Sequence, residues 1–332
     1  MVRVAINGFG RIGRLAFREM MNHDQLEVVA INDLSAPSML AYLLKYDSVQ
    51  GTFKKNVAHT DNALIVDGKE VTVYAERDPR NLPWDKHQID LVLECTGIFE
   101  SREKASAHLV AGAKKVIISA PSDKDVKTIV YNVNHGLLDA TDQLISCASC
   151  TTNCLAPMAK VLNDKFGIVA GQMTTIHAYT NSQPLMDTPD PKVNYRKSRA
   201  AADSIVPYTT GAAKAIGLVI PELKGKLDGS SQRVPVHSGS VVELFSLLGK
   251  TVSVEEVNAA MQAAANESYG YTEDPIVSAD VIGISYGSLF DATQTKIVTV
   301  GSQQLIKTVS WYDNEMSFVS QMVRTASYFG AL

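Results

Sequence analysis

The sequence predicts an α/β protein of two domains, the first built on a mostly parallel sheet and the second on a mainly antiparallel sheet. Over residues 2–131, short apolar runs typical of buried strands alternate with segments of helical spacing, which is the order of a parallel sheet. Beyond residue 150 the strand-like runs are longer and more often alternate apolar with polar residues. A length of 332 residues also suggests roughly two domains of about 150 residues each.

The first domain begins with a strand, a glycine turn and a helix. Residues 2–6 are apolar and β-branched, and the turn Gly8-Phe9-Gly10-Arg11-Ile12-Gly13 follows at once. Residues 14–21 have helical spacing, and a second buried strand at 26–31 leads to Asp33. Strand, turn, helix and an acidic residue about 20 positions past the last glycine together form the fingerprint of a Rossmann-type dinucleotide-binding domain.

Each part of this fingerprint has its own task. Gly8 permits the tight turn, Gly10 lets a pyrophosphate approach the backbone, and Gly13 lets the helix pack on the strand. The helix N-terminus offers N–H groups and a positive dipole to the pyrophosphate. Asp33 would accept hydrogen bonds from ribose hydroxyls and repel a 2′-phosphate, which favours NAD over NADP. The alternative is a glycine-rich turn that binds nothing.

Three more strand-like runs and one helical segment continue the first domain, at residues 90–95, 115–119 and 128–131, with the helix at 102–111. Thr96 and Gly97 follow the first of these runs, and Ser119 ends the second. Open α/β sheets bind ligands at the carboxyl ends of their strands, so these residues are expected to contact a cofactor. For Thr96 and Ser119 the alternative is a hydroxyl that caps a nearby turn.

The second domain has strand-like runs of a different kind, at residues 169–177, 232–236, 240–249, 295–300 and 304–311, with a helix at 254–265. Residues 180–202 have several prolines and little periodicity, a loop too long for a compact domain unless it serves a site or an interface. Residues 314–329 are helical again. We therefore expect an α+β domain with a mainly antiparallel sheet.

Composition limits the classes of partner. The chain is 45% hydrophobic and 20% charged, with a net charge of −4 and a pI near 6.0. Neither a basic tract nor a long apolar run occurs, so nucleic acid and membrane are not expected as primary partners. The N-terminus runs directly into the glycine turn without a signal-like stretch, which predicts a cytoplasmic protein. Its four cysteines are expected to be free thiols.

Three of those cysteines lie close together, at Cys147, Cys150 and Cys154. The first two have a spacing that would supply two zinc ligands, but no second pair of cysteines or histidines follows, so no metal is expected. A redox pair remains open, although the spacing falls across a strand-to-helix junction. The third reading is a single nucleophile with two buried bystanders.

The helix after this junction is expected to begin at Ser149 or Cys150 and to stop near Gly167. Cys150 would then lie in the first turn, where the helix dipole lowers the pKa of a thiol. His177 ends the next strand and is the best placed of seven histidines to act as its base. A lone histidine is more often structural, and the sequence leaves open whether the two side chains meet.

Five stretches carry a family resemblance: NGFGRIGR from Asn7, SCTTNC from Ser149, IHAYT from Ile176, TGAAK from Thr210 and WYDNE from Trp311. Together they resemble the phosphorylating glyceraldehyde-3-phosphate dehydrogenase family, and the match runs from residue 2 to about residue 329. The resemblance implies an NAD-binding domain at 1–148, completed by a C-terminal helix at about 314–332, and a catalytic domain at 149–313. It also implies a cytoplasmic homotetramer of the glycolytic and gluconeogenic pathway.

The same resemblance implies a reaction and a set of residues. Cys150 attacks the aldehyde of glyceraldehyde 3-phosphate to give a thiohemiacetal, His177 serves as base, NAD takes the hydride, and inorganic phosphate cleaves the thioester to 1,3-bisphosphoglycerate. The cofactor residues implied are Gly8, Gly10, Arg11, Ile12, Gly13, Asp33, Arg77, Thr96, Gly97, Ser119 and Asn314. Those implied for the attacking phosphate are Ser149, Thr151, Thr210 and Gly211, and those for the substrate's own phosphate are Thr180, Arg233 and Lys197.

Two departures and two rivals accompany this reading. Many members have arginine where this chain has Lys197, and residues 183–194 are unlike the usual version, which bears on substrate affinity, cofactor preference and subunit contacts. Erythrose-4-phosphate dehydrogenase is a close rival, but it tends to lose the Ala-Tyr-Thr after the histidine and the TGAAK run. A non-catalytic NAD-binding or surface-interaction protein is a rival of another class.

Overall fold

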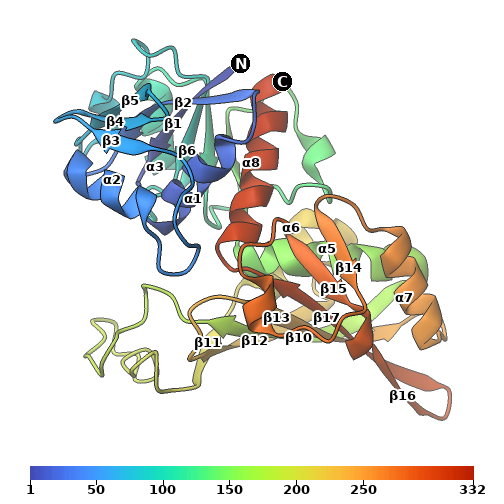
Figure 1. Cartoon of the computed structure of the whole chain (residues 1–332). Coiled ribbons are helices and arrows are strands. Elements are labelled where there is room, and N and C mark those ends of the chain that lie inside the picture. The colour runs from blue at the N-terminus through green and yellow to red at the C-terminus, as the bar shows by residue number, and fades with distance from the viewer. The chain divides into compact units, whose positions relative to one another are not determined.

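The computed structural model describes residues 1–332, which divide into two compact units. The first comprises Met1–Ser149 together with Val319–Leu332, and the second comprises Cys150–Phe318. Figure 1 shows a sheet in each unit with helices packed beside it. The first sheet is mostly parallel and the second is mixed with mainly antiparallel pairs, so the fold class predicted from the sequence is confirmed.

Nine strands form the sheet of the first unit, in the order β3-β4-β5-β2-β1-β6-β7-β9-β8. Their bounds are β1 (Val2–Asn7), β2 (Leu26–Asn32), β3 (Val57–His59), β4 (Ala63–Val66), β5 (Lys69–Tyr74), β6 (Leu91–Glu94), β7 (Lys115–Ile118), β8 (Lys127–Thr128) and β9 (Leu144–Ser146). The connecting helices are α1 (Arg11–Met20), α2 (Pro37–Lys45), α3 (Arg102–Ala105) and α4 (Ala107–Val110), with 3₁₀ turns η1 (Pro79–Asn81) and η2 (His135–Leu137). Only β3 with β4 and β4 with β5 pair antiparallel in this sheet.

The β4–β5 hairpin was not predicted, although its turn carries a signal. Asp67 and Gly68 both have positive φ, at 48° and 81°, and an Asp-Gly pair between two strands is typical of a two-residue hairpin turn. Two other predictions were wrong in detail. Residues 102–111 form two short helices, because the Ser106 hydroxyl donates to the Arg102 carbonyl and such bonding bends a helix. The strand predicted at 128–131 ends early, because the Asn134 side chain takes the Val130 N–H.

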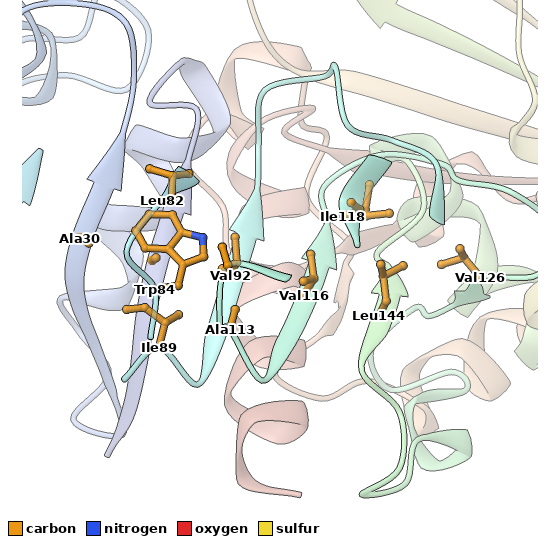
Figure 2. Packing of buried hydrophobic residues seen from close by; sticks show 13 residues of the cluster. Ala30, Leu82, Trp84, Ile89, Val92, Ala113, Val116, Ile118, Val126 and Leu144 are labelled. Atoms are coloured by element: carbon orange, nitrogen blue, oxygen red, sulfur yellow. The ribbon is translucent and has the colours of Figure 1, made fainter. Parts of the chain in front are cut away.

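The core of the first unit gathers around Trp84, whose side chain is fully buried. Figure 2 shows its indole ring among Leu82, Ile89 and Val92, and the same cluster extends along the sheet to Val116, Ile118 and Leu144. The last helix, α8 (Met316–Ala331), adds to this unit from residue 319 onward. Lys115 Nζ donates to the Phe329 carbonyl at 2.8 Å and lies 4.7 Å from the centre of its ring.

Eight strands form the second sheet, in the order β11-β12-β10-β13-β17-β15-β14, with β16 paired to β17 outside this path. Their bounds are β10 (Ile168–Ala178), β11 (Val206–Thr209), β12 (Leu227–Val234), β13 (Ser240–Leu248), β14 (Tyr269–Thr272), β15 (Ser288–Asp291), β16 (Lys296–Val300) and β17 (Gln303–Tyr312). The helices are α5 (Cys150–Phe166), α6 (Ala212–Val219) and α7 (Val254–Ala263), with 3₁₀ turns η3 (Pro221–Leu223), η4 (Ser278–Val281) and η5 (Ala292–Gln294). β10 runs parallel to β12 and β14 parallel to β15, whereas the other pairs are antiparallel.

Two features of the second unit bear on function. Residues 179–205 contain no helix or strand, and Figure 1 traces them as a long excursion between β10 and β11. Helix α5 starts at Cys150 and ends one residue before Gly167, as predicted. Nowhere in the chain is a helix both long and apolar enough to cross a bilayer.

Candidate active site

The glycine turn lies between β1 and α1 in the first unit, and its three glycines meet three different needs. Gly8 has a φ of 89°, and a Cβ there would lie 2.7 Å from the backbone nitrogen of Thr96. A Cβ on Gly10 would meet no atom within 4 Å, so this side of the turn is open. A Cβ on Gly13 would lie 2.1 Å from the Gly8 carbonyl oxygen. Tight turn, open approach and close packing are the three properties that a dinucleotide turn requires.

The N-terminus of α1 is free of any side-chain cap. Gly10 is the N-cap residue, and Arg11, Ile12 and Gly13 form the first turn, whose N–H groups have no partner within the helix. The Arg11 side chain pairs with the Asp47 carboxylate. A pyrophosphate would therefore be held by backbone N–H groups and not by the Arg11 guanidinium.

A cavity of about 390 Å³ opens beside this turn. Five of the residues expected to bind cofactor line it, namely Gly8, Gly10, Asp33, Arg77 and Thr96. The lining residues that were not among the predicted cofactor residues are Asn7, Asn32, Leu34, Glu76, Cys95, Ile98 and Phe99. Asn7 and Asn32 end β1 and β2, so the rule that ligands lie at carboxyl ends of strands would have found them.

Asp33 of this lining is tied to the glycine turn, and two further residues of the predicted set, Gly97 and Ser119, lie next to the lining. Asp33 Oδ2 accepts the Phe9 N–H at 2.8 Å, which ties the carboxylate to the glycine turn. Gly97 follows Thr96 with a φ of 70°, and Ser119 hydrogen-bonds the Cys95 thiol without itself lining the cavity.

Beneath Thr96 lies a fully buried polar network. The N–H and the hydroxyl of Thr96 both donate to Glu94 Oε1, and Asn7 Nδ2 donates to Glu94 Oε2 at 2.6 Å. Trp84 Nε1 donates to His108 Nδ1 at 3.1 Å, so His108 carries its proton on Nε2 and donates it to Glu94 Oε2 at 2.9 Å. These bonds fix the turn that follows β6, and the sequence offered no local signal for them.

In the second unit, Cys150 is the first residue of α5, and its sulfur faces His177. The distance from Cys150 Sγ to His177 Nε2 is 3.4 Å. His177 is 4% exposed and comes from the end of β10. The structure thus brings together the two residues predicted from the sequence as nucleophile and base.

The other ring nitrogen of His177 determines which nitrogen carries the proton. Nδ1 lies 2.6 Å from the Ala178 carbonyl oxygen, which can only accept a hydrogen bond. Nδ1 must therefore hold the proton in the neutral ring, and Nε2 presents its lone pair to the thiol. Arg233 Nη1 donates to the same carbonyl at 3.0 Å and lies 2.9 Å from Nδ1.

Burial acts on both members of this pair. It raises the pKa of the Cys150 thiol, which the Arg233 guanidinium and bonds from Thr151 lower in part. It lowers the pKa of His177 to about 3, and Arg233 adds to that effect. The expectation that a place at the helix N-terminus lowers the pKa of Cys150 is therefore wrong, because burial outweighs that effect. Transfer of the proton from Cys150 Sγ to His177 Nε2 creates a thiolate beside an imidazolium, so the net charge of the buried pair stays zero. Formation of the thiolate therefore depends on His177 as the proton acceptor.

The two neighbouring thiols have a different setting. Cys147 and Cys154 are 1% and 0% exposed. Burial raises the pKa of Cys147 to about 12 and that of Cys154 further. Cys154 Sγ contacts the Ser310 carbonyl at 3.5 Å, within the core below α5. Neither thiol has the histidine partner that Cys150 has, which favours one nucleophile over a redox pair.

Tyr312 links the helix to the sheet and was not predicted. Its hydroxyl lies 2.9 Å from Thr151 Oγ1 and 2.8 Å from Thr175 Oγ1, and its ring meets that of His177 edge-on at 5.8 Å. A tyrosine 161 residues from its helix partner gives no signal in a local sequence pattern.

The remaining residues of the predicted set are spread over the second unit and its edge. Thr180 Oγ1 lies 2.9 Å from Ser182 Oγ, and Thr210 Oγ1 accepts the Ala212 N–H at 3.1 Å. Gly211 is the N-cap of α6, which packs against α5. Asn314 Oδ1 accepts from Ser240 at 3.1 Å, and Ser149 directly precedes α5.

Comparison with known proteins gives a consistent result over the whole chain. The family model "Glyceraldehyde 3-phosphate dehydrogenase, NAD binding domain" matches residues 2–102, and "Glyceraldehyde 3-phosphate dehydrogenase, C-terminal domain" matches residues 149–314. The glyceraldehyde-3-phosphate dehydrogenases of Clostridium pasteurianum and Clostridium acetobutylicum are 66% and 64% identical over 332 residues, covering 100% of this chain and 99% of each relative. That of Streptococcus pyogenes serotype M1 is 60% identical over 333 residues, with the same coverage.

Proposed function

Since the chain belongs to the glyceraldehyde-3-phosphate dehydrogenase family, we propose that it oxidises glyceraldehyde 3-phosphate, with NAD and inorganic phosphate, to 1,3-bisphosphoglycerate. This is an oxidoreductase reaction of glycolysis and gluconeogenesis. The observation that carries the assignment of residues is the 3.4 Å contact between Cys150 Sγ and His177 Nε2, with Nδ1 fixed as a donor by Ala178.

Cys150 and His177 divide the covalent chemistry between them. His177 Nε2 takes the thiol proton as the sulfur bonds to the aldehyde carbon, and then passes that proton to the carbonyl oxygen, which becomes the hydroxyl of a thiohemiacetal. The Cys150 N–H at the start of α5 would stabilise the developing oxyanion. His177 then removes the hydroxyl proton as the carbon is oxidised, which leaves a thioester. Phosphate attacks that carbon, and the thiolate departs.

NAD supplies the acceptor for the hydride. The first-unit residues that would hold it are the uncapped N–H groups of α1, the open face of Gly10, and the carboxylate of Asp33 for the ribose hydroxyls. Asn314 would orient the nicotinamide amide, since its Oδ1 is already bonded to Ser240 and its Nδ2 is left as donor.

Two groups of residues are assigned to phosphates. The attacking phosphate would be held by Ser149, Thr151, Thr210 and Gly211, which supply hydroxyls and N–H groups at the starts of α5 and α6. The substrate's own phosphate would be held by Thr180, Lys197 and Arg233, which supply one hydroxyl and two cations.

Absorbance at 340 nm tests the proposal directly. With glyceraldehyde 3-phosphate and NAD, NADH formation should be rapid only when inorganic phosphate is present, and Cys150→Ser should abolish it. A rate that ignores phosphate would indicate a hydrolytic dehydrogenase. A higher kcat/KM for erythrose 4-phosphate would favour the related enzyme, and the absence of signal would favour a binding protein.

A homotetramer and a cytoplasmic location are further parts of the proposal. The long loop exposes large apolar side chains at Leu185, Met186, Val193 and Tyr195, each between 67% and 82% exposed, as expected of a surface that another subunit covers. A reactive thiol among four free cysteines suits a reducing compartment. Light scattering of the purified protein tests the first point, and cell fractionation tests the second.

A further inference from the structure

Two positively charged side chains lie over the ring of Tyr208. Lys197 Nζ is 4.6 Å from the ring centre, and Arg233 Cζ is 5.1 Å from it. Both distances are within the reach of about 6 Å over which a cation is attracted to an aromatic face. Tyr208 and Lys197 are both half-buried, so water screens these contacts only in part.

Strand register explains how Tyr208 reaches Arg233. In the antiparallel pair β11–β12, Val206 is opposite Arg233 and Tyr208 is opposite Ser231. Tyr208 therefore lies on the same face as Arg233, at the diagonal position that aromatic and long side chains can span. On the other side of β12, His177 of β10 is the register partner of Arg233. A line of contacts thus runs from Lys197 through Tyr208, Arg233 and His177.

Neither cation is neutralised. The ion pair of the long loop joins Arg199 to Asp187 at 2.9 Å and does not include Lys197. Arg233 donates to the Ala178 carbonyl, and its Nε is buried without a hydrogen-bond partner. Two positive charges held at one ring, with no carboxylate on either, are available to an anion.

We propose that Tyr208 is a positioning residue for the phosphate of the aldehyde substrate, which holds Lys197 beside Arg233 before the anion arrives. This inference rests on the proposed function. The two cations would otherwise repel each other, and the ring offsets that repulsion without cancelling their charge as a carboxylate would.

The position of the line of contacts decides which phosphate it serves. Arg233 approaches His177 at Nδ1, whereas Cys150 Sγ faces Nε2. A phosphate that attacks the thioester must touch the carbon bonded to Sγ. The pair of cations lies beyond the imidazole ring, where it suits the phosphate at the far end of the substrate.

Kinetics of Tyr208→Leu and Tyr208→Phe provide the test. Tyr208→Leu should raise KM for glyceraldehyde 3-phosphate by about 2- to 30-fold, the range expected when a cation–π contact is lost. KM for inorganic phosphate and kcat/KM for unphosphorylated glyceraldehyde should stay unchanged. Tyr208→Phe keeps the ring and should restore the wild-type KM. Tyr271→Leu, another half-buried tyrosine of the same unit, should leave all three constants unchanged.

A second measurement needs no turnover. Glycerol 3-phosphate should protect Cys150 from iodoacetamide, and half-protection should require about 2- to 30-fold more of it in Tyr208→Leu. Four results would each overturn the inference. In Tyr208→Leu these are unchanged protection by glycerol 3-phosphate, an equal loss of kcat/KM on unphosphorylated glyceraldehyde, and a raised KM for inorganic phosphate. The fourth is a Tyr208→Phe variant that binds the substrate as weakly as Tyr208→Leu. If the wild-type protein oxidised no aldehyde, the proposed function would fail, while the protection assay would still decide the role of Tyr208.

Discussion

Replacing His177 with asparagine should make Cys150 a poor nucleophile at neutral pH. Burial raises the pKa of the thiol on its own, and the imidazole is the group that accepts its proton. A thiolate and an imidazolium 3.4 Å apart attract each other by about 5 kcal/mol at an effective dielectric constant of about 20. The cost of burying the imidazolium offsets part of this attraction, so we expect alkylation of Cys150 at pH 7 to slow by about 10²-fold.

The sign of the pH effect follows from the same shifts. The lowered pKa of His177 keeps the imidazole neutral from pH 5 to 8, so the lone pair of Nε2 faces the thiol throughout that range. Without it, the thiol must ionise against burial, so the alkylation curve of His177→Asn should move to higher pH. The oxidative step should slow by about 10²- to 10⁴-fold, the usual effect of removing an acid–base group.

Iodoacetamide labelling of the cofactor-free enzyme across a pH series, with the labelled cysteine identified by mass spectrometry, measures this directly. His237→Asn is the matched control, since His237 is exposed and belongs to neither candidate site. The reasoning is refuted if His177→Asn and wild type share one pH curve, or if Cys147 or Cys154 is labelled as fast as Cys150. The second result would return the cysteine cluster to the redox reading.

Three further predictions concern the cofactor and the substrate. Asp33→Ala should lower the ratio of kcat/KM for NAD to that for NADP, because a negative charge and two hydrogen-bond acceptors are lost together. Glu76→Gln is the control and should leave that ratio unchanged. The opposite pattern would assign the cofactor preference to Glu76. Gly13→Ala should lower the Tm, because the new Cβ would lie 2.1 Å from the Gly8 carbonyl oxygen. Gly10→Ala should keep the wild-type Tm but weaken NAD binding measured by calorimetry. Equal Tm values for the two variants would contradict the packing argument. Arg233→Leu should raise KM for glyceraldehyde 3-phosphate far more than for glyceraldehyde, because only the former carries a phosphate. Equal losses would instead indicate misfolding or a change at His177, which Arg233 contacts.

The sequence predicted those parts of the candidate site whose residues lie close together along the chain. The glycine turn was predicted because turn, open approach and packing all arise within six residues, at Gly8, Gly10 and Gly13. The place of Cys150 at the start of α5 was predicted for the same reason, since a strand, a junction and a helix follow one another along the chain. The sequence could not predict that the pKa of Cys150 is raised, because burial by distant segments determines it.

Contacts that depend on strand pairing were beyond a single sequence. Arg233 lies 56 residues after His177 and meets it only because β12 runs parallel to β10 in one register. Tyr208 meets Arg233 through a second pairing, between β11 and β12. To predict either contact, one must know which strands pair and in which register. Neither is encoded in the residue spacing of a single segment.

The register that joins His177 to Arg233 is itself fixed by packing four residues earlier in β10. Met173 is opposite Gly229, and a Cβ on that glycine would lie 2.4 Å from the methionine sulfur, so no other residue fits there without displacing the side chain. A slip of β12 by one residue would set Asp228 or Ser230 against Met173 and would turn Arg233 to the opposite face of the sheet. The electrostatic setting of His177 is therefore maintained by an apolar contact in the core, and a substitution at Gly229 should affect catalysis although it touches no group of the candidate site.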